Sequence, residues 1–140
     1  MKMLVAAVGS LKDRGLQSIV DDYVRRASRR VPINIVEVKN SSALVKAVPK
    51  GYLKVALDER GKLLTTKELA AVLERMMQTA IPGAAWLIGG AHGLEDEVKR
   101  GSDWMLSLSP MTFPHRLARV ILCEQLYRAL SILQGEPYHK

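Results

Sequence analysis

The sequence predicts an α/β protein built on a parallel sheet with helices on both faces. Short apolar runs typical of buried strands alternate with amphipathic helix patterns along the whole chain, which implies helical crossovers between parallel strands. The chain has 140 residues, the size of one domain, and an apolar share of 48% that favours an ordered core. We therefore expect a single domain over residues 1–140.

The first half of the chain predicts strands and helices in alternation. Expected strands cover residues 3–8, 33–38 and 54–57, and expected helices cover residues 16–30 and about 44–48. The first helix shows apolar residues at spacings of three and four. The charged residues 58–62 predict a turn that follows the third strand.

The second half continues the alternation. Thr65 and Glu68 have the spacing of a capping box, which predicts a helix start there, and Pro82 and Gly83 predict its end. Pro114 suits the first turn of a long last helix, where its missing N–H carries no penalty. The remaining expected strands cover residues 84–88 and 104–108, and the remaining helices cover residues 95–100 and 114–133.

The last helix is apolar on two sides, which predicts that it is buried on two sides. In a chain of this size we expect a second subunit to supply one of the covers, so the pattern favours a homodimer. One face carries Leu122, Leu126, Ala129, Leu130 and Leu133, and the other carries Leu117, Val120 and Ile121.

The formal net charge is +7, which favours a polyanionic partner such as nucleic acid over a merely soluble basic protein. Four arginines, Arg25, Arg26, Arg29 and Arg30, lie near the end of the first helix. They either complement the carbonyl end of the helix dipole or form a phosphate-contacting patch, and the sequence supports both interpretations.

The chain predicts a soluble cytoplasmic protein. It has no run of 18 apolar residues, and Lys12, Asp13 and Arg14 interrupt the apolar N-terminus, so a buried first strand fits better than a signal peptide. The single cysteine, Cys123, cannot form a disulfide within the chain, and with only three histidines we expect no metal site.

Two loops are candidates for ligand binding. Gly89, Gly90 and Gly93 follow the fourth strand without the dinucleotide-binding spacing, so they either admit a ligand close to the backbone or mark a tight turn. Residues 107–114 contain two prolines, which either stiffen a binding loop or make a rigid connector.

Polar side chains on the last helix form a third candidate. Glu124 and Arg128 have the spacing of an ion pair, and Arg119 interrupts an apolar stretch. No nucleophile–base–acid constellation is evident in the sequence.

Several motifs resemble ribosomal RNA large subunit methyltransferase H, a family of the SPOUT class. They are LDERGK at residues 57–62, LIGGAHGL at 87–94, SLSPMTFPH at 107–115, EQLYRA at 124–129 and PYH at 137–139. The resemblance covers the full length and is strongest after residue 54. The segment 40–51 is shorter than is usual for the family, and nothing is carried over to it.

The resemblance implies a SPOUT-type fold with a C-terminal trefoil knot and an S-adenosyl-L-methionine pocket made by loops of the knot. Through the matching motifs, the implied cofactor-binding residues are Leu57, Gly89, Gly90, Leu108, Ser109, Pro110, Met111, Thr112, Phe113 and Pro114.

The resemblance also implies an activity, the methylation of N3 of a pseudouridine in helix 69 of 23S rRNA on the assembled ribosome by a homodimer. The implied catalytic residues are His139, Arg128 and Tyr138, and Lys140 is suited to assist them. In the family, the C-terminal tail that carries Tyr138, His139 and Lys140 lies near the partner's cofactor, whereas Arg128 is on the last helix. The alternative is a non-catalytic RNA-binding or ribosome-assembly module on the same fold.

Overall fold

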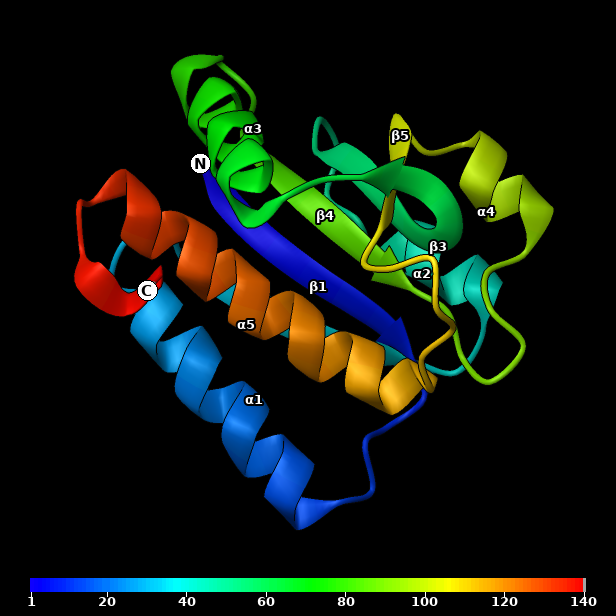
Figure 1. Ribbon diagram of the computed structural model, residues 1–140. Coiled ribbons are helices and arrows are strands. Elements are labelled where there is room, and N and C mark those ends of the chain that lie inside the picture. The colour runs from blue at the N-terminus through cyan, green and yellow to red at the C-terminus, as the bar shows by residue number, and fades with distance from the viewer. Residues whose placement is uncertain (140) are drawn as a thin grey trace.

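The computed structural model describes the backbone of residues 1–139 and the side chains of residues 1–138. Five parallel strands form one sheet in the order β2-β1-β4-β3-β5 (Figure 1). The strands are β1 (Lys2–Val8), β2 (Ile33–Val38), β3 (Leu53–Leu63), β4 (Gly83–Ile88) and β5 (Trp104–Ser107). This confirms the predicted α/β class.

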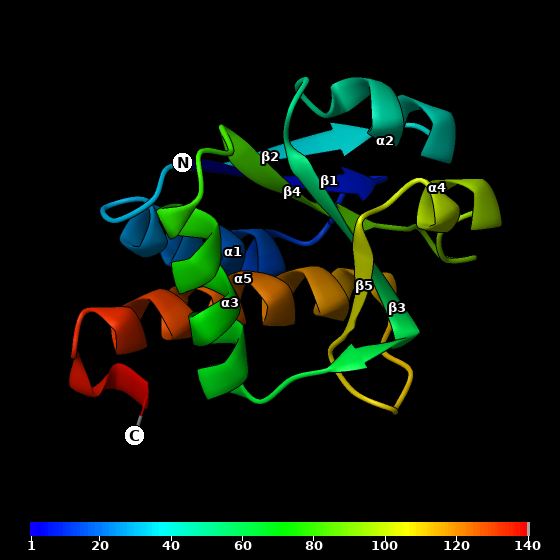
Figure 2. The same ribbon diagram turned by 90° about the horizontal axis from the view of Figure 1, so that it is seen from above.

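Helices cover both faces of the sheet, as Figure 2 shows. Helices α1 (Arg14–Ala27), α3 (Thr66–Gln78) and α5 (His115–Leu133) lie on one face. Helices α2 (Ser41–Ala47) and α4 (Asp96–Arg100) lie on the other. A short 3-10 turn, η1 (Pro137–His139), packs against α5. No helix in residues 1–139 has the length and apolar character needed to cross a membrane.

Strand β1 shows why the sheet is buried on both sides. Met3, Val5 and Ala7 belong to the core cluster beneath α1, α3 and α5. The intervening Leu4 and Ala6 belong to the cluster beneath α2 and α4. Successive side chains of a strand point to opposite faces, so a strand covered on both sides reads as a continuous apolar run.

Local capping fixes several helix starts. The Thr65 and Glu68 capping box is present, with the Thr65 hydroxyl accepting from the Glu68 N–H at 3.1 Å and Glu68 accepting from the Thr65 N–H at 2.8 Å. Helix α1 begins earlier than predicted because the Asp13 carboxylate accepts the Leu16 N–H at 3.0 Å. Asn40 caps α2 in the same way through the Ala43 N–H.

The prediction that β3 ends at Leu57 was wrong. The strand resumes after a bulge, since Leu57 and Lys62 both pair with Leu106 of β5. Gly61 sits so close to β5 that a Cβ there would lie 2.7 Å from the Met105 carbonyl group. Residues 58–61 therefore form a bulge within one strand, and the charged turn predicted there is part of β3.

Helix α5 packs between α1 and α3 on the sheet, and this explains most of its two-sided apolar pattern. Leu122 and Leu126 are fully buried in the core, and Val120 packs against the cluster of Leu11, Val20 and Cys123. The prediction that a second subunit covers the whole second face of α5 was therefore wrong, because α1 covers the part around Val120. On this face Leu117 is 42% exposed, and Val120 and Ile121 are half-buried.

The homodimer and the trefoil knot stay predictions. From the edge strand β5 the chain returns to α5, a helix buried on the sheet. This path and the sheet order are consistent with a knot.

Leu126→Ala is expected to lower the free energy of unfolding by about 2–5 kcal/mol, because the substitution leaves a cavity in the core. Ile19→Ala, at a position of α1 that is 43% exposed, is the matched control and should change stability by less than about 1 kcal/mol. Urea denaturation followed by circular dichroism measures both. Equal losses would contradict the assignment of the buried face.

Candidate functional site

The bulge of β3 and the turns that follow β4 and β5 meet at the carboxyl edge of the sheet, where ligands of open α/β sheets bind. Together with the first turn of α5 they enclose a cavity of about 790 Å³. Nine of the ten residues implied as cofactor-binding line it, namely Leu57, Gly89, Gly90, Leu108, Ser109, Met111, Thr112, Phe113 and Pro114. Pro110 is not part of the lining.

The glycines after β4 shape the wall of the cavity through their own turn. The Gly93 N–H donates to the Gly90 carbonyl at 3.0 Å, and a Cβ on Gly89 would lie 2.3 Å from the Gly93 carbonyl carbon. A Cβ on Gly90 would meet the Val8 side chain at 3.3 Å. A larger residue at Gly90 would therefore press on β1, so a substitution there would disturb the fold as well as ligand binding in the cavity.

The loop after β5 is held by hydrogen bonds at three points. The buried Ser107 hydroxyl donates to the Ser109 carbonyl at 2.9 Å, and the Met111 N–H donates to the Ser109 hydroxyl at 2.9 Å. The Thr112 hydroxyl donates to the Glu59 carboxylate at 2.6 Å, which ties this loop to the bulge of β3. The loop is thus ordered by the fold as well as by its prolines.

Asp58 links the bulge of β3 to α4 at the rim of the cavity. The Lys99 ammonium lies 2.5 Å from its carboxylate, and the Arg60 N–H donates to it at 2.8 Å. Burial acts to raise the pKa of Asp58, but the bonds and charges of Lys99 and Arg60 outweigh it and lower the pKa. The sequence marked this segment only as a charged turn.

His115 opens α5 and lines the cavity. Burial lowers the pKa of its imidazole, and the nearby charges of Arg116 and Arg119 lower it further. The neutral imidazole is therefore favoured, and it both donates and accepts hydrogen bonds. His115 was not among the implied site residues, although it is the last residue of the SLSPMTFPH motif at residues 107–115.

Two of the three implied catalytic residues lie together, in a cluster formed by α5, α1 and the C-terminal tail. The Arg128 guanidinium lies 4.9 Å from the centre of the Tyr138 ring. Its Nε donates to Glu124 at 2.6 Å, which confirms the predicted ion pair. The side chain of His139 and all of Lys140 lie outside the described residues.

Residues of α1 complete this cluster, and sequence reasoning missed them. The Arg26 guanidinium lies 4.4 Å from the Tyr127 ring centre and 5.3 Å from that of Tyr138. The Tyr138 and Tyr23 hydroxyls are hydrogen-bonded at 3.2 Å. Burial, then the bond to Tyr23 and the charge of Glu124, raise the pKa of Tyr138 to about 12. No periodicity could reveal contacts between segments more than 100 positions apart.

The cluster and the cavity lie near opposite ends of α5. Ala118 lines the cavity, and Arg128 is about 15 Å further along the axis at about 1.5 Å of rise per residue. Within one chain, the implied catalytic residues and the implied cofactor residues are therefore not brought together.

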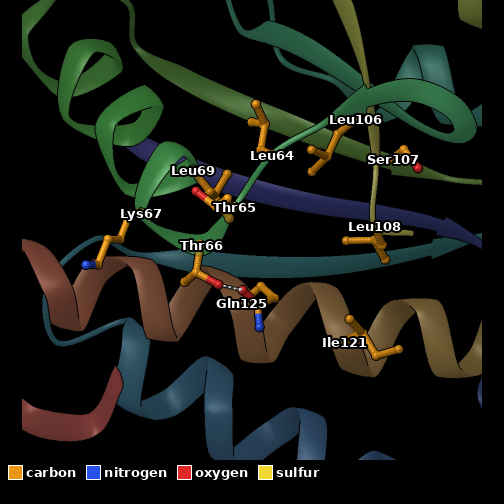
Figure 3. Close-up of a pocket in the computed structure, with 10 residues that line it drawn as sticks. All are labelled: Leu64, Thr65, Thr66, Lys67, Leu69, Leu106, Ser107, Leu108, Ile121 and Gln125. Carbon is orange, nitrogen blue, oxygen red and sulfur yellow. Dashed lines mark hydrogen bonds between the residues drawn. The ribbon is translucent and has the colours of Figure 1, made fainter. Parts of the chain in front are cut away.

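A second hollow of about 500 Å³ lies between the start of α3, the end of β5 and the middle of α5 (Figure 3). The Thr66 hydroxyl donates to the Gln125 side-chain oxygen at 2.8 Å across it. Leu106 and Leu108 line both this hollow and the cavity, and Ile121 forms part of its floor on α5. The open apolar face of α5 therefore continues into the hollow.

A family model described as predicted SPOUT methyltransferase matches residues 1–139. The chain belongs to the SPOUT methyltransferase family. A protein of Sorangium cellulosum is 41% identical to it, with 99% of each chain covered. A protein of Coprothermobacter proteolyticus is 40% identical over the whole of both chains. Both are named ribosomal RNA large subunit methyltransferase H, which confirms the resemblance seen in the motifs.

Solved structures share the fold at low sequence identity. A probable methyltransferase from Bordetella pertussis has a TM-score of 0.61 at 12% identity, with 92% of this chain and 96% of that chain covered. A putative methyltransferase from Legionella pneumophila, solved with SAM bound, has a TM-score of 0.54 at 15% identity, with coverages of 92% and 66%. Among the described side chains, those of residues 1–138, no three from His, Cys, Asp or Glu gather as a metal site would require.

Asp58→Asn is expected to destabilise the protein at neutral pH, because Lys99 loses its carboxylate partner. Since the folded pKa of Asp58 is lowered, its contribution is fully present above the unfolded value of about 4 and is lost as the pH falls through the folded pKa. The gap in unfolding free energy between wild type and variant should therefore be constant from about pH 5 to 7 and shrink below about pH 4. Urea titrations across this range test it, and a gap that widens on acidification would contradict it.

Proposed function

We propose that this chain is an S-adenosylmethionine-dependent methyltransferase of ribosomal RNA. The observation that carries the proposal is the cavity at the carboxyl edge, which gathers nine of the ten residues implied as cofactor-binding. The substrate class rests on the name shared by the full-length relatives.

The cavity suits the cofactor in size and chemistry. Its volume of about 790 Å³ lies within the usual range for small-molecule sites, about 300–1,000 Å³. Leu57, Leu108 and Phe113 provide apolar walls for a base and a thioether, and the turns around them present backbone N–H and C=O groups. Three rigid turns from three strands hold such a ligand with little loss of entropy.

When bound, S-adenosylmethionine supplies an electrophilic methyl group and leaves as the neutral thioether. The protein must then place the target nitrogen in line with that methyl group, accept the proton that the nitrogen loses and balance the anion formed. The Arg128 guanidinium provides positive charge for an imidate anion. Because the pKa of Tyr138 is raised to about 12, its hydroxyl stays protonated and serves as a hydrogen-bond donor. His139 is then the candidate base of the tail, since imidazole accepts a proton near neutral pH.

A second copy of the chain would complete the site. The tail lies about 15 Å from the cavity along its own α5, too far to act there. An antiparallel pairing of two α5 helices through Leu117 and Ile121 would place the Arg128 end of one helix beside the cavity of the other. The open apolar face of α5 supports this homodimer, and the hollow beside Ile121 offers room for the partner.

The finer substrate is N3 of a pseudouridine in helix 69 of 23S rRNA, methylated on assembled ribosomes in the cytoplasm. The net charge of +7 supports a polyanionic partner of this kind. Mass mapping of 23S rRNA from cells that lack the protein tests this assignment, and an unchanged helix 69 would overturn it.

Ala118→Phe is expected to weaken S-adenosylmethionine binding by at least about tenfold, roughly 1.4 kcal/mol, because the ring enters the cavity from the first turns of α5. Ala71→Phe, at an exposed position of α3, is the matched control and should bind as wild type does. Isothermal titration calorimetry measures both. Wild-type protein that gives no heat at high micromolar cofactor would favour a non-catalytic RNA-binding module instead.

The partner's tail can be tested by mixing two inactive proteins. Deletion of residues 137–140 should abolish activity without affecting cofactor binding, and Ala118→Phe should abolish cofactor binding with the tail intact. Co-expressed, about half of the dimers are mixed, and each mixed dimer has one complete site, so about one quarter of wild-type methyl transfer should return. No recovery despite confirmed mixed dimers would show that each chain uses its own tail or none.

A further inference from the structure

Four exposed cations lie in the segments that follow β1 and β2 and in the first turns of α1 and α5, outside the lining of the cavity. Lys12 and Arg14 lie in the segment between β1 and the first turn of α1, Lys39 follows β2, and Arg116 is in the first turn of α5. Within residues 1–139 none of the four has an ion-pair or hydrogen-bond partner for its side chain. We call these four side chains the edge cations.

The edge cations are held close to one another by the backbone. The Gly9 N–H donates to the Val38 carbonyl at 2.8 Å, which joins the segment before Lys12 to the one before Lys39. Figure 1 shows that α5 begins beside the end of β1 and that a loop leads from β1 to the start of α1. Val8 packs against the Gly90 turn, and His115 lines the cavity, so the edge cations lie on its β1 side.

The buried Arg119 removes the acidic charge that would oppose them. Its side chain is 2% exposed, and it donates to the Glu37 carboxylate and, at 2.9 Å, to the Gly9 carbonyl. A guanidinium buried in this way needs such partners to offset its desolvation. The ion pair with Arg119 neutralises Glu37 beside Lys39, and the hydrogen bond to the Gly9 carbonyl fixes the start of the loop after β1. This loop continues to Lys12, which adopts a φ of 54°.

The remaining acid of this loop, Asp13, caps α1 by accepting the Leu16 N–H and keeps its negative charge, so the four edge cations still outnumber it. By contrast, the arginines at the far end of α1 are engaged within the protein. Arg25 and Arg26 pair with Asp22, and Arg30 pairs with Glu136. Three of the four arginines that suggested a phosphate patch therefore have structural partners, whereas the edge cations have none among the described residues.

We propose that Lys12, Arg14, Lys39 and Arg116 bind phosphate groups of the rRNA strand that carries the target nucleotide, and so position that nucleotide over the cavity. The inference rests on the proposed function and deepens it. Unpaired, flexible cations without neighbouring aromatic platforms suit backbone contacts, which fix register and carry no sequence information. Base recognition is then left to the cavity and the tail.

The test compares two fourfold variants of equal charge. In the edge variant, Lys12, Arg14, Lys39 and Arg116 are each changed to Gln. In the control variant, Lys2, Arg29, Lys50 and Arg75, which are exposed at the opposite end of the sheet, are each changed to Gln. Binding to 70S ribosomes from cells that lack the protein is measured at several salt concentrations, alongside S-adenosylmethionine affinity and thermal stability.

The edge variant should bind ribosomes at least about tenfold more weakly than the control variant. A plot of the logarithm of its binding constant against the logarithm of salt concentration should be shallower by about 3, because each lost phosphate contact lowers the slope by about 0.7–0.9. Its cofactor affinity and thermal transition should match those of wild type. Equal binding by both variants, or an equal loss in both, would overturn the edge-cation proposal. Failure of the wild type to bind cofactor or methylate ribosomes would instead refute the proposed function, so the two failures are distinguishable.

Discussion

The burial of α5 against the sheet is the constraint on which the rest of the structure depends. Its leucines fill the core between α1 and α3, and this fixes the direction and depth of the whole helix. The first turn of α5 is thereby set against the cavity, and Tyr127 in its second half against Tyr138 of the tail. A helix that packed less tightly against the sheet would not fix the distance between the cavity and the tail.

The same helix carries the charges that order its surroundings. Arg119 is buried in its first half and anchors the ends of β1 and β2, whereas Arg128 lies in its second half beside Glu124 and Tyr138. One buried arginine thus shapes the approach to the cavity, and the other belongs to the group proposed for chemistry. Their separation along α5 keeps the cavity and the cluster around Arg128 apart within one chain.

The cavity obtains its rigidity from links between its turns. The contact of Thr112 with Glu59 ties the loop after β5 to the bulge of β3, and Asp58 ties that bulge to α4 through Lys99. Each link joins segments that are distant in sequence, so the cavity exists only when the sheet is complete. Cofactor binding and folding stability are therefore coupled in this protein.

The sequence by itself determined the alternation of strands and helices, because apolar periodicity and caps such as Thr65 with Glu68 act over a few residues. It also determined the family, since the motifs around Gly89, Ser109 and Arg128 are local strings. Only the tertiary structure decided that β3 continues past its bulge, that α1 covers part of α5, and that Arg26 and Tyr23 surround Tyr138. These features depend on contacts between distant segments, and such contacts follow from the packing of the whole sheet, which no local pattern encodes.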